Sequence, residues 1–296
     1  MRLGFVGLGA IGAPMAGRIV ASGQQLGVWN RSAGKLAGLV GRGAVATPTP
    51  AALAECCDIL CLCVTDATAL DAVVFGRDGI AAARHAPAYV VDHSTVPPED
   101  TRRLAARLAE ATGTIWVDAP VSGGIIGAEQ GTLAAFVGGP SDAFAAVRGV
   151  LGHYCGTVTH MGPTGSGQAT KACNQMIGFL SAVAVAEALV LAERLGVQID
   201  RLPDALSGGF ADVPALREWR RNMAQLPLIG LPLHIEALRA FLSGDRPAPP
   251  YDGASPANLR KDIGIIRDLA RETGTALPLT EQMALTIALL HASRGA

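Results

Sequence analysis

Short apolar runs alternate with alanine-rich helical patterns through the first half of the chain, and glycine and proline residues mark the joins. The six runs are Leu3–Gly7, Gln25–Trp29, Ile59–Val64, Ala88–Asp92, Ile115–Asp118 and Ala134–Val137. Alternation of this kind is typical of βαβ units, in which crossover helices join parallel strands. The pattern therefore predicts an α/β fold with a Rossmann-type, doubly wound and mostly parallel sheet over residues 1–162.

The pattern changes from strands to helices after His160. One helical stretch, Thr164–Leu195, stops at Gly196, and the segments after it contain no convincing strand pattern. The prolines and the glycine of Pro247–Pro256 predict a loop inside this half. We therefore expect an all-helical C-terminal domain over residues 163–296, joined to the first domain by the long helix.

A glycine-rich turn follows the first predicted strand. Its G-x-G-x-x-G spacing lets the chain turn tightly, brings backbone N–H groups to a pyrophosphate and packs the next helix on the strand. Because a strand precedes the turn and a helix follows it, a dinucleotide site is favoured over a purely structural turn. We expect the cofactor to contact Gly7, Leu8, Gly9, Ala10, Ile11 and Gly12.

The end of the second predicted strand carries Asn30, Arg31 and Ser32, where an NAD-dependent enzyme usually has an acidic residue. A guanidinium binds a phosphate through two parallel hydrogen bonds, and the neighbouring amide and hydroxyl add donors. We therefore expect these three residues to bind the 2′-phosphate of NADP, with NAD as the less favoured cofactor. The alternative interpretation is that Arg31 is only a solvated loop charge.

Composition and charge argue against several classes of function. Half of the 296 residues are hydrophobic, and 24 basic residues are balanced by 25 acidic ones, so no overall field attracts nucleic acid or an anionic membrane. Charged residues interrupt the most apolar stretch, so no transmembrane helix is expected. The six cysteines lack the paired CxxC spacing of a zinc site, so no metal site is expected. Four of them lie in one apolar run, which is typical of small buried hydrophobic residues and favours a reducing, cytoplasmic location.

A Ser-Gly-Gly turn lies just past the fifth predicted strand, at the edge of the sheet where open α/β folds bind ligands. Ser122, with the backbone N–H groups of Gly123 and Gly124, would form a small nest for a carboxylate. A plain structural turn is the alternative interpretation. The expected partner of this turn is a small carboxylate-bearing substrate.

Three polar residues share one face of the long helix. Lys171, Asn174 and Gln175 stand at positions i, i+3 and i+4, so an amine and two amides lie side by side. The amides can hold a substrate oxygen while the amine exchanges a proton with it, which makes all three candidate catalytic residues. Lys261, which precedes Asp262, could reach the nicotinamide or the substrate. For both lysines a structural role, at a helix start or in a surface charge pair, stays open.

These motifs, together with Cys63-Val64-Thr65-Asp66 and Asp92-His93-Ser94-Thr95-Val96-Pro97, occur in an order that resembles the β-hydroxyacid dehydrogenase family over almost the whole chain. Members of that family include 3-hydroxyisobutyrate dehydrogenase and tartronate semialdehyde reductase. The resemblance implies an NADP-binding Rossmann domain and a helical domain for substrate binding and dimerisation. It further implies that Lys171 is the general acid/base and that Ser122–Gly124 hold the substrate carboxylate. The residues that it places beside the cofactor are Val64, Thr65, Thr95 and Lys261.

The activity that the resemblance implies is transfer of a hydride between the nicotinamide and a small 3-hydroxy acid, or the corresponding semialdehyde or keto acid. In the oxidative direction Lys171 would accept the hydroxyl proton, and reduction reverses this step. A homodimer or a homotetramer is the expected assembly. Two alternatives stay open: a catalytically silent NADP-binding protein, and an imine reductase, although those relatives usually have Asp or Tyr in place of Lys171.

The chain departs from the family at Gln175, which replaces the second asparagine of the family's Lys-x-x-Asn-Asn motif and is one methylene longer. The stretch between the long helix and Lys261, which includes Leu226–Pro232 and Pro247–Pro256, also looks longer than usual. Because the helical domain is expected to wall the substrate side, both departures leave room for an unusual or larger substrate.

Overall fold

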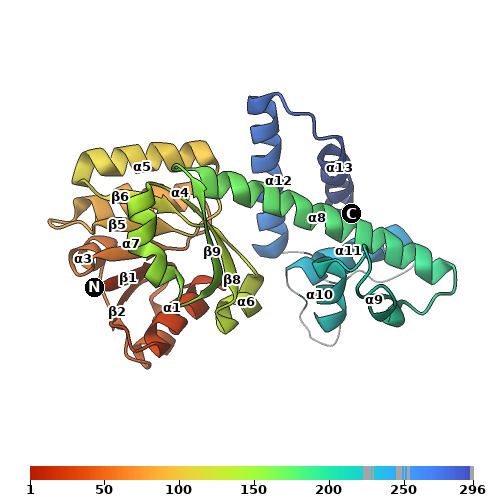
Figure 1. Ribbon diagram of the computed structural model, residues 1–296, viewed down its shortest axis with the longest axis horizontal. Coiled ribbons are helices and arrows are strands. Elements are labelled where there is room, and N and C mark those ends of the chain that lie inside the picture. The colour runs from red at the N-terminus through yellow and green to blue at the C-terminus, as the bar shows by residue number, and fades with distance from the viewer. Residues whose placement is uncertain (223–227, 229, 245–248, 250, 252–253, 294–296) are drawn as a thin grey trace. The chain divides into compact units, whose positions relative to one another are not determined.

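The computed structural model describes residues 1–222, 228, 230–244, 249, 251 and 254–293 of the chain (Figure 1). The chain divides into two compact units, Met1–Lys171 and Ala172–Ala296. The unit boundary lies inside a long helix, so the start of that helix belongs to unit 1. The domain ranges 1–162 and 163–296 stay a prediction.

A nine-stranded sheet forms the centre of unit 1. Its strands follow the order β3-β2-β1-β4-β5-β6-β8-β7, and β9 pairs with β8. The strands from β3 across to β6 pair in parallel, whereas β8 runs antiparallel to β6 and β7 and parallel to β9. The mostly parallel, Rossmann-type sheet is thereby confirmed. The strands are β1 (Leu3–Val6), β2 (Leu26–Trp29), β3 (Val45–Ala46), β4 (Ile59–Leu62), β5 (Tyr89–Asp92), β6 (Ile115–Asp118), β7 (Val121–Ser122), β8 (Leu133–Gly138) and β9 (Cys155–Gly162).

The six predicted strands correspond to β1, β2, β4, β5, β6 and β8, whereas β3, β7 and β9 were not predicted. β3 and β7 are only two residues long, too short to show a periodic pattern. β9 is longer, but only its first residue, Cys155, is buried, and the rest are exposed or half-buried. A strand of this kind lacks the apolar run by which buried strands are found.

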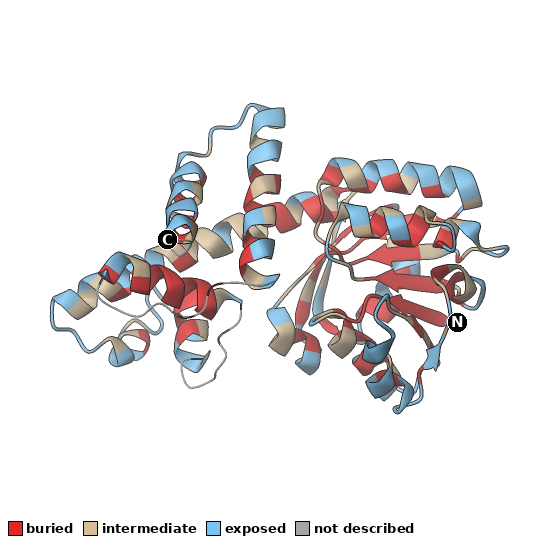
Figure 2. Ribbon diagram, turned by 180° about the vertical axis from the view of Figure 1, so that it is seen from behind, coloured by how far each residue is buried: buried red, intermediate tan, exposed pale blue. Residues whose placement is uncertain are grey.

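Helices cover both faces of the sheet, and successive side chains of a strand point to opposite faces, so a strand such as β1 contributes to two cores. In β1, Leu3 and Phe5 enter the core on one face, whereas Val6 enters the core on the other. Figure 2 shows the strands of this sheet as mostly buried. The helices that supply the first core are α1 (Gly12–Ala21), α2 (Ala37–Val40), α6 (Gly124–Gln130) and α7 (Ser141–Leu151). Those that supply the second are α3 (Pro50–Glu55), α4 (Ala67–Phe75) and α5 (Pro98–Thr112).

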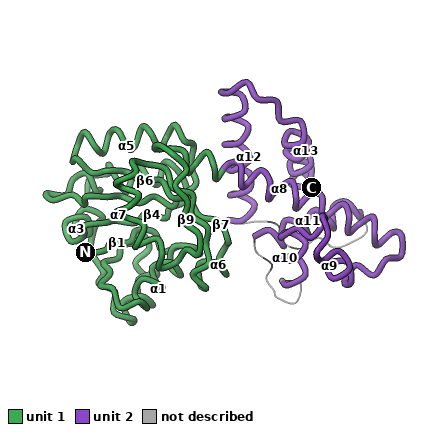
Figure 3. Tube along the Cα trace, viewed as in Figure 1, with its two compact units in different colours: residues 1–171 green, residues 172–296 purple. Residues whose placement is uncertain are grey.

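The described residues of unit 2 (purple in Figure 3) form helices joined by loops, with no strand among them, which confirms the helical C-terminal region. Its helices are α8 (Ser166–Arg194), which begins in unit 1, α9 (Leu202–Ala205), α10 (Pro214–Asn222), α11 (Leu231–Ser243), α12 (Ala254–Thr273) and α13 (Pro278–Ala292). Their apolar faces meet in one core, to which α8 contributes Ala186 and Leu189. The long stretch that was noted between Leu226 and Pro256 lies partly outside the described residues.

A buried charged cluster joins three helices of unit 2. The Arg239 guanidinium on α11 donates to Glu236 Oε1 at 3.0 Å and to Glu193 Oε2 on α8 at 3.1 Å. Trp219 Nε1 on α10 donates to the same Glu236 carboxylate at 2.5 Å. Because each buried charge has an opposite charge and hydrogen bonds, the cluster avoids the large cost of an isolated buried ion.

One helix among the described residues, α8, is long and apolar enough to cross a membrane by length and composition alone. Such a helix was not expected from the sequence, because charged residues interrupt it. Core helices of soluble proteins can have the same length and composition, and 33% of the most apolar 18-residue segment of α8 is buried inside the protein. The expected absence of a membrane partner therefore stays a prediction.

Candidate active site

The glycine-rich turn between β1 and α1 is shaped by close backbone contacts. Gly7 has a φ of 93°, and a Cβ at this position would lie 2.1 Å from the carbonyl oxygen of Cys63. A Cβ at Gly12 would lie 2.0 Å from the carbonyl oxygen of Gly7. At Gly9, in contrast, a Cβ would meet no atom within 4 Å, so this turn leaves open space at the start of α1. Tight packing at Gly7 and Gly12 with open space at Gly9 fits a bound pyrophosphate.

Asn30 connects the glycine-rich turn to the loop after β2. The Leu8 N–H donates to Asn30 Oδ1 at 2.8 Å, and Asn30 Nδ2 donates to the Ser32 carbonyl at 2.9 Å. Both polar groups of the Asn30 side chain are therefore engaged inside the protein. Arg31 and Ser32 are exposed, and their expected contact with a 2′-phosphate stays a prediction.

The loops that follow β4 and β5 are tied to each other. The backbone N–H of Val64 donates to Ser94 Oγ at 3.0 Å, and the Ser94 N–H donates to Asp92 Oδ1 at 2.9 Å. The Thr65 hydroxyl donates to Asp66, which caps the start of α4. Val64 and Thr65 thus lie in a fixed loop at the carboxyl end of the sheet, the edge at which such folds bind ligands.

Gln168 on α8 holds the backbone on both sides of Thr95. Its Nε2 donates to the Ser94 carbonyl at 2.7 Å, and its Oε1 accepts the Val96 N–H at 3.3 Å. The Gln168 side chain is buried. Its role was not predicted, although it stands three residues before Lys171 and so on the same face of the helix.

Asp118, the last residue of β6, fixes the start of α8. Its carboxylate accepts the backbone N–H groups of Gly165 at 2.7 Å and Gln168 at 3.0 Å. A Cβ at Gly167 would lie 2.3 Å from the Phe136 carbonyl oxygen, so only glycine allows the helix to approach the sheet this closely. Burial raises the pKa of the Asp118 carboxyl, an effect that the two N–H donors oppose. This capping role also was not predicted from the sequence.

Lys171 and the Ser-Gly-Gly turn come together within unit 1. The Lys171 side chain is 7% exposed, and its Nζ donates to the carbonyl oxygen of Val121 at 2.8 Å. Val121 begins β7, the two-residue strand that ends at Ser122. The structure thus places the amine one peptide from the predicted carboxylate site.

The turn itself owes its course to two successive glycines. Gly123 has a φ of 129° and Gly124 a φ of 65°, values that side-chain-bearing residues rarely adopt. Both glycines are exposed and Ser122 is half-buried, so the turn is accessible to a ligand. A substrate carboxylate bound here stays a prediction.

In unit 2, a network of polar side chains links the remaining predicted residues. Asn174 Nδ2 donates to Gln175 Oε1 at 3.1 Å, and Gln175 Nε2 donates to Asp262 Oδ2 on α12 at 2.7 Å. Lys261 Nζ lies 3.2 Å from the other oxygen of the same carboxylate. Asp262, which is buried, therefore connects Asn174, Gln175 and Lys261, and this role was not foreseen.

Comparison with known proteins supports this arrangement of motifs. A family model for the NAD binding domain of 6-phosphogluconate dehydrogenase matches residues 2–162, and one for the NAD-binding region of NADP-dependent 3-hydroxyisobutyrate dehydrogenase matches residues 165–225. The 2-hydroxy-3-oxopropionate reductase of Escherichia coli K12 is 39% identical over 71% of this chain and 72% of its own length.

Two solved structures resemble the chain over nearly its full length. Mycobacterium tuberculosis 3-hydroxyisobutyrate dehydrogenase with L-serine has a TM-score of 0.76 at 31% identity, over 98% of this chain and 94% of its own. Psf3 in complex with NADP+ and 2-OPP has a TM-score of 0.79 at 25% identity, over the same shares of the two chains. The chain therefore belongs to the β-hydroxyacid dehydrogenase family, as its ordered motifs predict.

Proposed function

We propose that this protein is an NADP(H)-dependent oxidoreductase that transfers a hydride between the nicotinamide and a small 3-hydroxy acid or the corresponding semialdehyde or keto acid. The observation that carries the proposal is the hydrogen bond from the buried Lys171 amine to the Val121 carbonyl, one residue before Ser122. A carboxylate on this turn would bring the rest of a short substrate towards the amine. That geometry suits an acid with its reacting oxygen a few bonds from the carboxylate.

The bound cofactor supplies or accepts the hydride, and the protein supplies the proton. In the oxidative direction Lys171 Nζ, as the neutral amine, takes the hydroxyl proton while the C–H electron pair leaves as hydride. In the reductive direction the Lys171 ammonium returns a proton to the carbonyl oxygen. Asn174, one helical turn along α8, is the candidate to hold that oxygen.

NADP preference is the finer part of the proposal. The residues after β2 are Asn30, Arg31 and Ser32, none of them acidic, so nothing there repels a 2′-phosphate. Arg31 is exposed and can turn its guanidinium to a bound phosphate. One matching family model is that of an NADP-dependent enzyme, and Psf3 was solved with NADP+, which supports the same cofactor here.

A substrate and cofactor panel tests the proposal. Short 3-hydroxy acids, the matching semialdehydes and cyclic imines are assayed with NADPH or NADP+ and with NADH or NAD+. We expect turnover of hydroxy acids or semialdehydes, a higher kcat/KM with the phosphorylated cofactor, and loss of that preference in Arg31→Ala. Turnover of imines alone would support an imine reductase, and a preference for NADH in the parent would remove Arg31 from the proposed role.

A further inference from the structure

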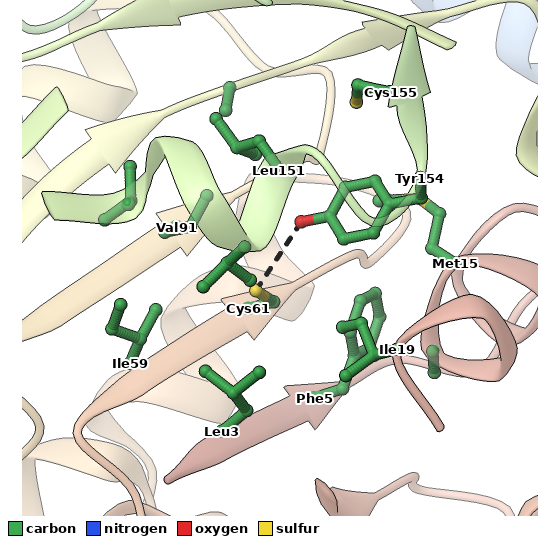
Figure 4. Close-up of a cluster of buried hydrophobic side chains, with 14 of the residues drawn as sticks. Leu3, Phe5, Met15, Ile19, Ile59, Cys61, Val91, Leu151, Tyr154 and Cys155 are labelled. Atoms are coloured by element: carbon green, nitrogen blue, oxygen red, sulfur yellow. Dashed lines mark hydrogen bonds between the residues drawn. The ribbon is translucent and has the colours of Figure 1, made fainter. Parts of the chain in front are cut away.

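A chain of buried polar groups lies within the sheet of unit 1, and none of the roles described above uses it. His93 Nδ1 lies 2.7 Å from the Ala119 carbonyl oxygen, and His93 Nε2 lies 2.9 Å from the Tyr154 hydroxyl. The Tyr154 hydroxyl is also 3.7 Å from Cys61 Sγ, the contact that Figure 4 marks in the core. All three side chains are buried. Taking polar groups out of water costs free energy that apolar side chains of the same size would not cost, which points to a function for these three residues.

Only one assignment of donors and acceptors satisfies this series of hydrogen bonds. The Ala119 carbonyl can only accept, so Nδ1 of the neutral His93 ring carries the hydrogen and Nε2 accepts. Tyr154 must then donate its single O–H to His93, which leaves the Cys61 thiol to donate to the Tyr154 oxygen. Burial lowers the pKa of His93 to about 4 and raises that of Cys61 to about 12, so both keep these forms near neutral pH.

The Ala119 carbonyl, the last acceptor of this hydrogen-bonded series, belongs to the backbone that leads to the Ser122 turn. The Ala119 N–H donates to the Asp92 carbonyl at 2.7 Å, and its carbonyl accepts from His93, so consecutive residues of β5 and its loop hold both polar groups of Ala119. Pro120, which follows, accepts the Phe136 N–H at 3.1 Å. The next residue is Val121, whose carbonyl receives Lys171 Nζ.

We propose that His93, oriented by Tyr154, is a positioning residue for Lys171: it holds the Ala119 carbonyl and thereby sets the place of the Val121 carbonyl and of the Ser122 turn. The inference rests on the proposed role of Lys171. His93 itself touches neither of those groups and acts only through the backbone. Its packing supports a fixed ring, because Tyr154 meets it edge-on with ring centroids 5.4 Å apart, and Phe5 stacks on it at 6.4 Å.

Two amide substitutions separate the two bonds of His93. The Asn amide nitrogen takes the place of Nδ1, so His93→Asn keeps a donor for Ala119 and loses the bond to Tyr154. The longer Gln amide takes the place of Nε2, so His93→Gln keeps the bond to Tyr154 and loses the one to Ala119. Thr114→Val is the matched control, because it removes a buried hydrogen bond to the Pro87 carbonyl at the opposite end of β6.

Lysine labelling gives a readout that does not depend on turnover. The chain contains only three lysines, Lys35, Lys171 and Lys261, so mass spectrometry resolves acetylation at each of them. Lys35 is exposed and serves as the internal reference for the buried Lys171. We expect His93→Gln to raise the labelling rate of Lys171 relative to Lys35 severalfold. The same variant should lower kcat/KM for the hydroxy acid about tenfold, with the Kd of NADPH unchanged.

His93→Asn, which keeps the bond to Ala119 but loses the orienting bond to Tyr154, is expected to raise Lys171 labelling less than His93→Gln does. Thr114→Val is expected to lower the melting temperature with labelling and kinetics unchanged. Parental labelling of Lys171 in a folded His93→Gln protein would overturn the positioning role. Should His93→Gln not fold, Tyr154→Phe decides in its place: the ring then loses its orienting bond, and Lys171 labelling should rise in the same direction. Parental labelling in Tyr154→Phe would overturn the proposal. If the parent turns over no hydroxy acid, the proposed function fails while the labelling still decides this inference.

Discussion

Gln175 is one point at which this chain departs from its family, and the hydrogen bonds of its side chain show what the longer amide does. The extra methylene carries the amide to Asp262, 2.7 Å away on α12, and the same carboxylate holds Lys261. Gln175 therefore supports the polar network of unit 2, and its expected catalytic role stays a prediction. A buried carboxylate that loses a donor costs about 1–3 kcal/mol.

Gln175→Asn is expected to lower the free energy of unfolding by that amount, because the shorter amide no longer reaches Asp262. Arg267→Gln, on the same helix α12, is the control, since it breaks an exposed ion pair with Glu281 that contributes little. Thermal unfolding of both variants checks the prediction. An unchanged melting temperature in Gln175→Asn would show that the bond to Asp262 contributes nothing.

Two buried histidines are expected to make the free energy of unfolding depend on pH. Burial lowers the pKa of His93 and of His234 to about 4, and the charge of His291 adds to the effect on His234. His93 faces Tyr154, and His234 faces the Tyr251 hydroxyl at 2.8 Å. An unfolded histidine titrates near 6.5, so below that pH the unfolded chain binds more protons than the folded one.

Stability is therefore expected to be fully present above about pH 6.5 and to fall as the pH drops towards 4, by roughly 3 kcal/mol for each histidine. The raised pKa of Asp118 acts in the opposite sense and offsets part of the loss. Melting temperatures of the parent and His93→Asn between pH 4.5 and 7.5 measure the effect. If the variant loses as much stability on acidification as the parent, His93 is not a source of the pH dependence.

Among the helices and strands, the buried elements could be predicted and the contacts between them could not. Alternation of apolar runs with helical patterns located six strands, and the glycine spacing located the turn before α1. β9 was not predicted because its residues after Cys155 are not buried and so form no apolar run. Asp118, Gln168 and Asp262 were not predicted because each hydrogen-bonds to groups 47 or more residues away in the chain, and no periodic pattern records such contacts.

The start of α8 depends on a single carboxylate. In Asp118→Asn one oxygen is replaced by an NH2 group, so one of the two N–H donors of Gly165 and Gln168 faces another donor. We expect a loss of about 1–3 kcal/mol in unfolding free energy. We also expect kcat to fall roughly ten- to a hundredfold, because the helix that carries Lys171 shifts.

Asp66→Asn is the control for stability, since asparagine caps the start of a helix as well as aspartate does. Urea unfolding and steady-state kinetics check Asp118→Asn. Parental kinetics in this variant, at any melting temperature, would show that the cap does not set the place of Lys171.

For the chain as a whole, the apolar surface of α8 bears on assembly. Ile177, Leu191 and Leu195 are exposed on or just after this helix, although other residues of α8 pack in the core of unit 2. Exposed apolar side chains gathered along one helix usually mark a contact with another chain or a membrane. We propose the first, a homodimer or a homotetramer of a cytoplasmic protein.

Light scattering of the detergent-free protein is expected to give twice or four times the chain mass, because pairing covers these side chains. Leu191→Glu should shift the assembly towards the monomer while the fold is kept, whereas Val40→Glu, at an exposed apolar site of unit 1, should leave it unchanged. A parent that stays monomeric, or that is recovered with lipid vesicles, would contradict this assignment.

The proton transfer assigned to Lys171 underlies the whole functional account, and the chain's own lysines allow a clean test of it. Lys171→Met keeps the length and apolar stem of the side chain, and Lys35→Met is the control at an exposed position. The measurement is kcat for the preferred hydroxy acid, with the Kd of NADPH determined on the same samples. We predict that Lys171→Met binds NADPH as the parent does and loses about 10²- to 10⁴-fold in kcat, while Lys35→Met keeps the kcat of the parent. A Lys171→Met protein with the turnover of the parent would contradict the account.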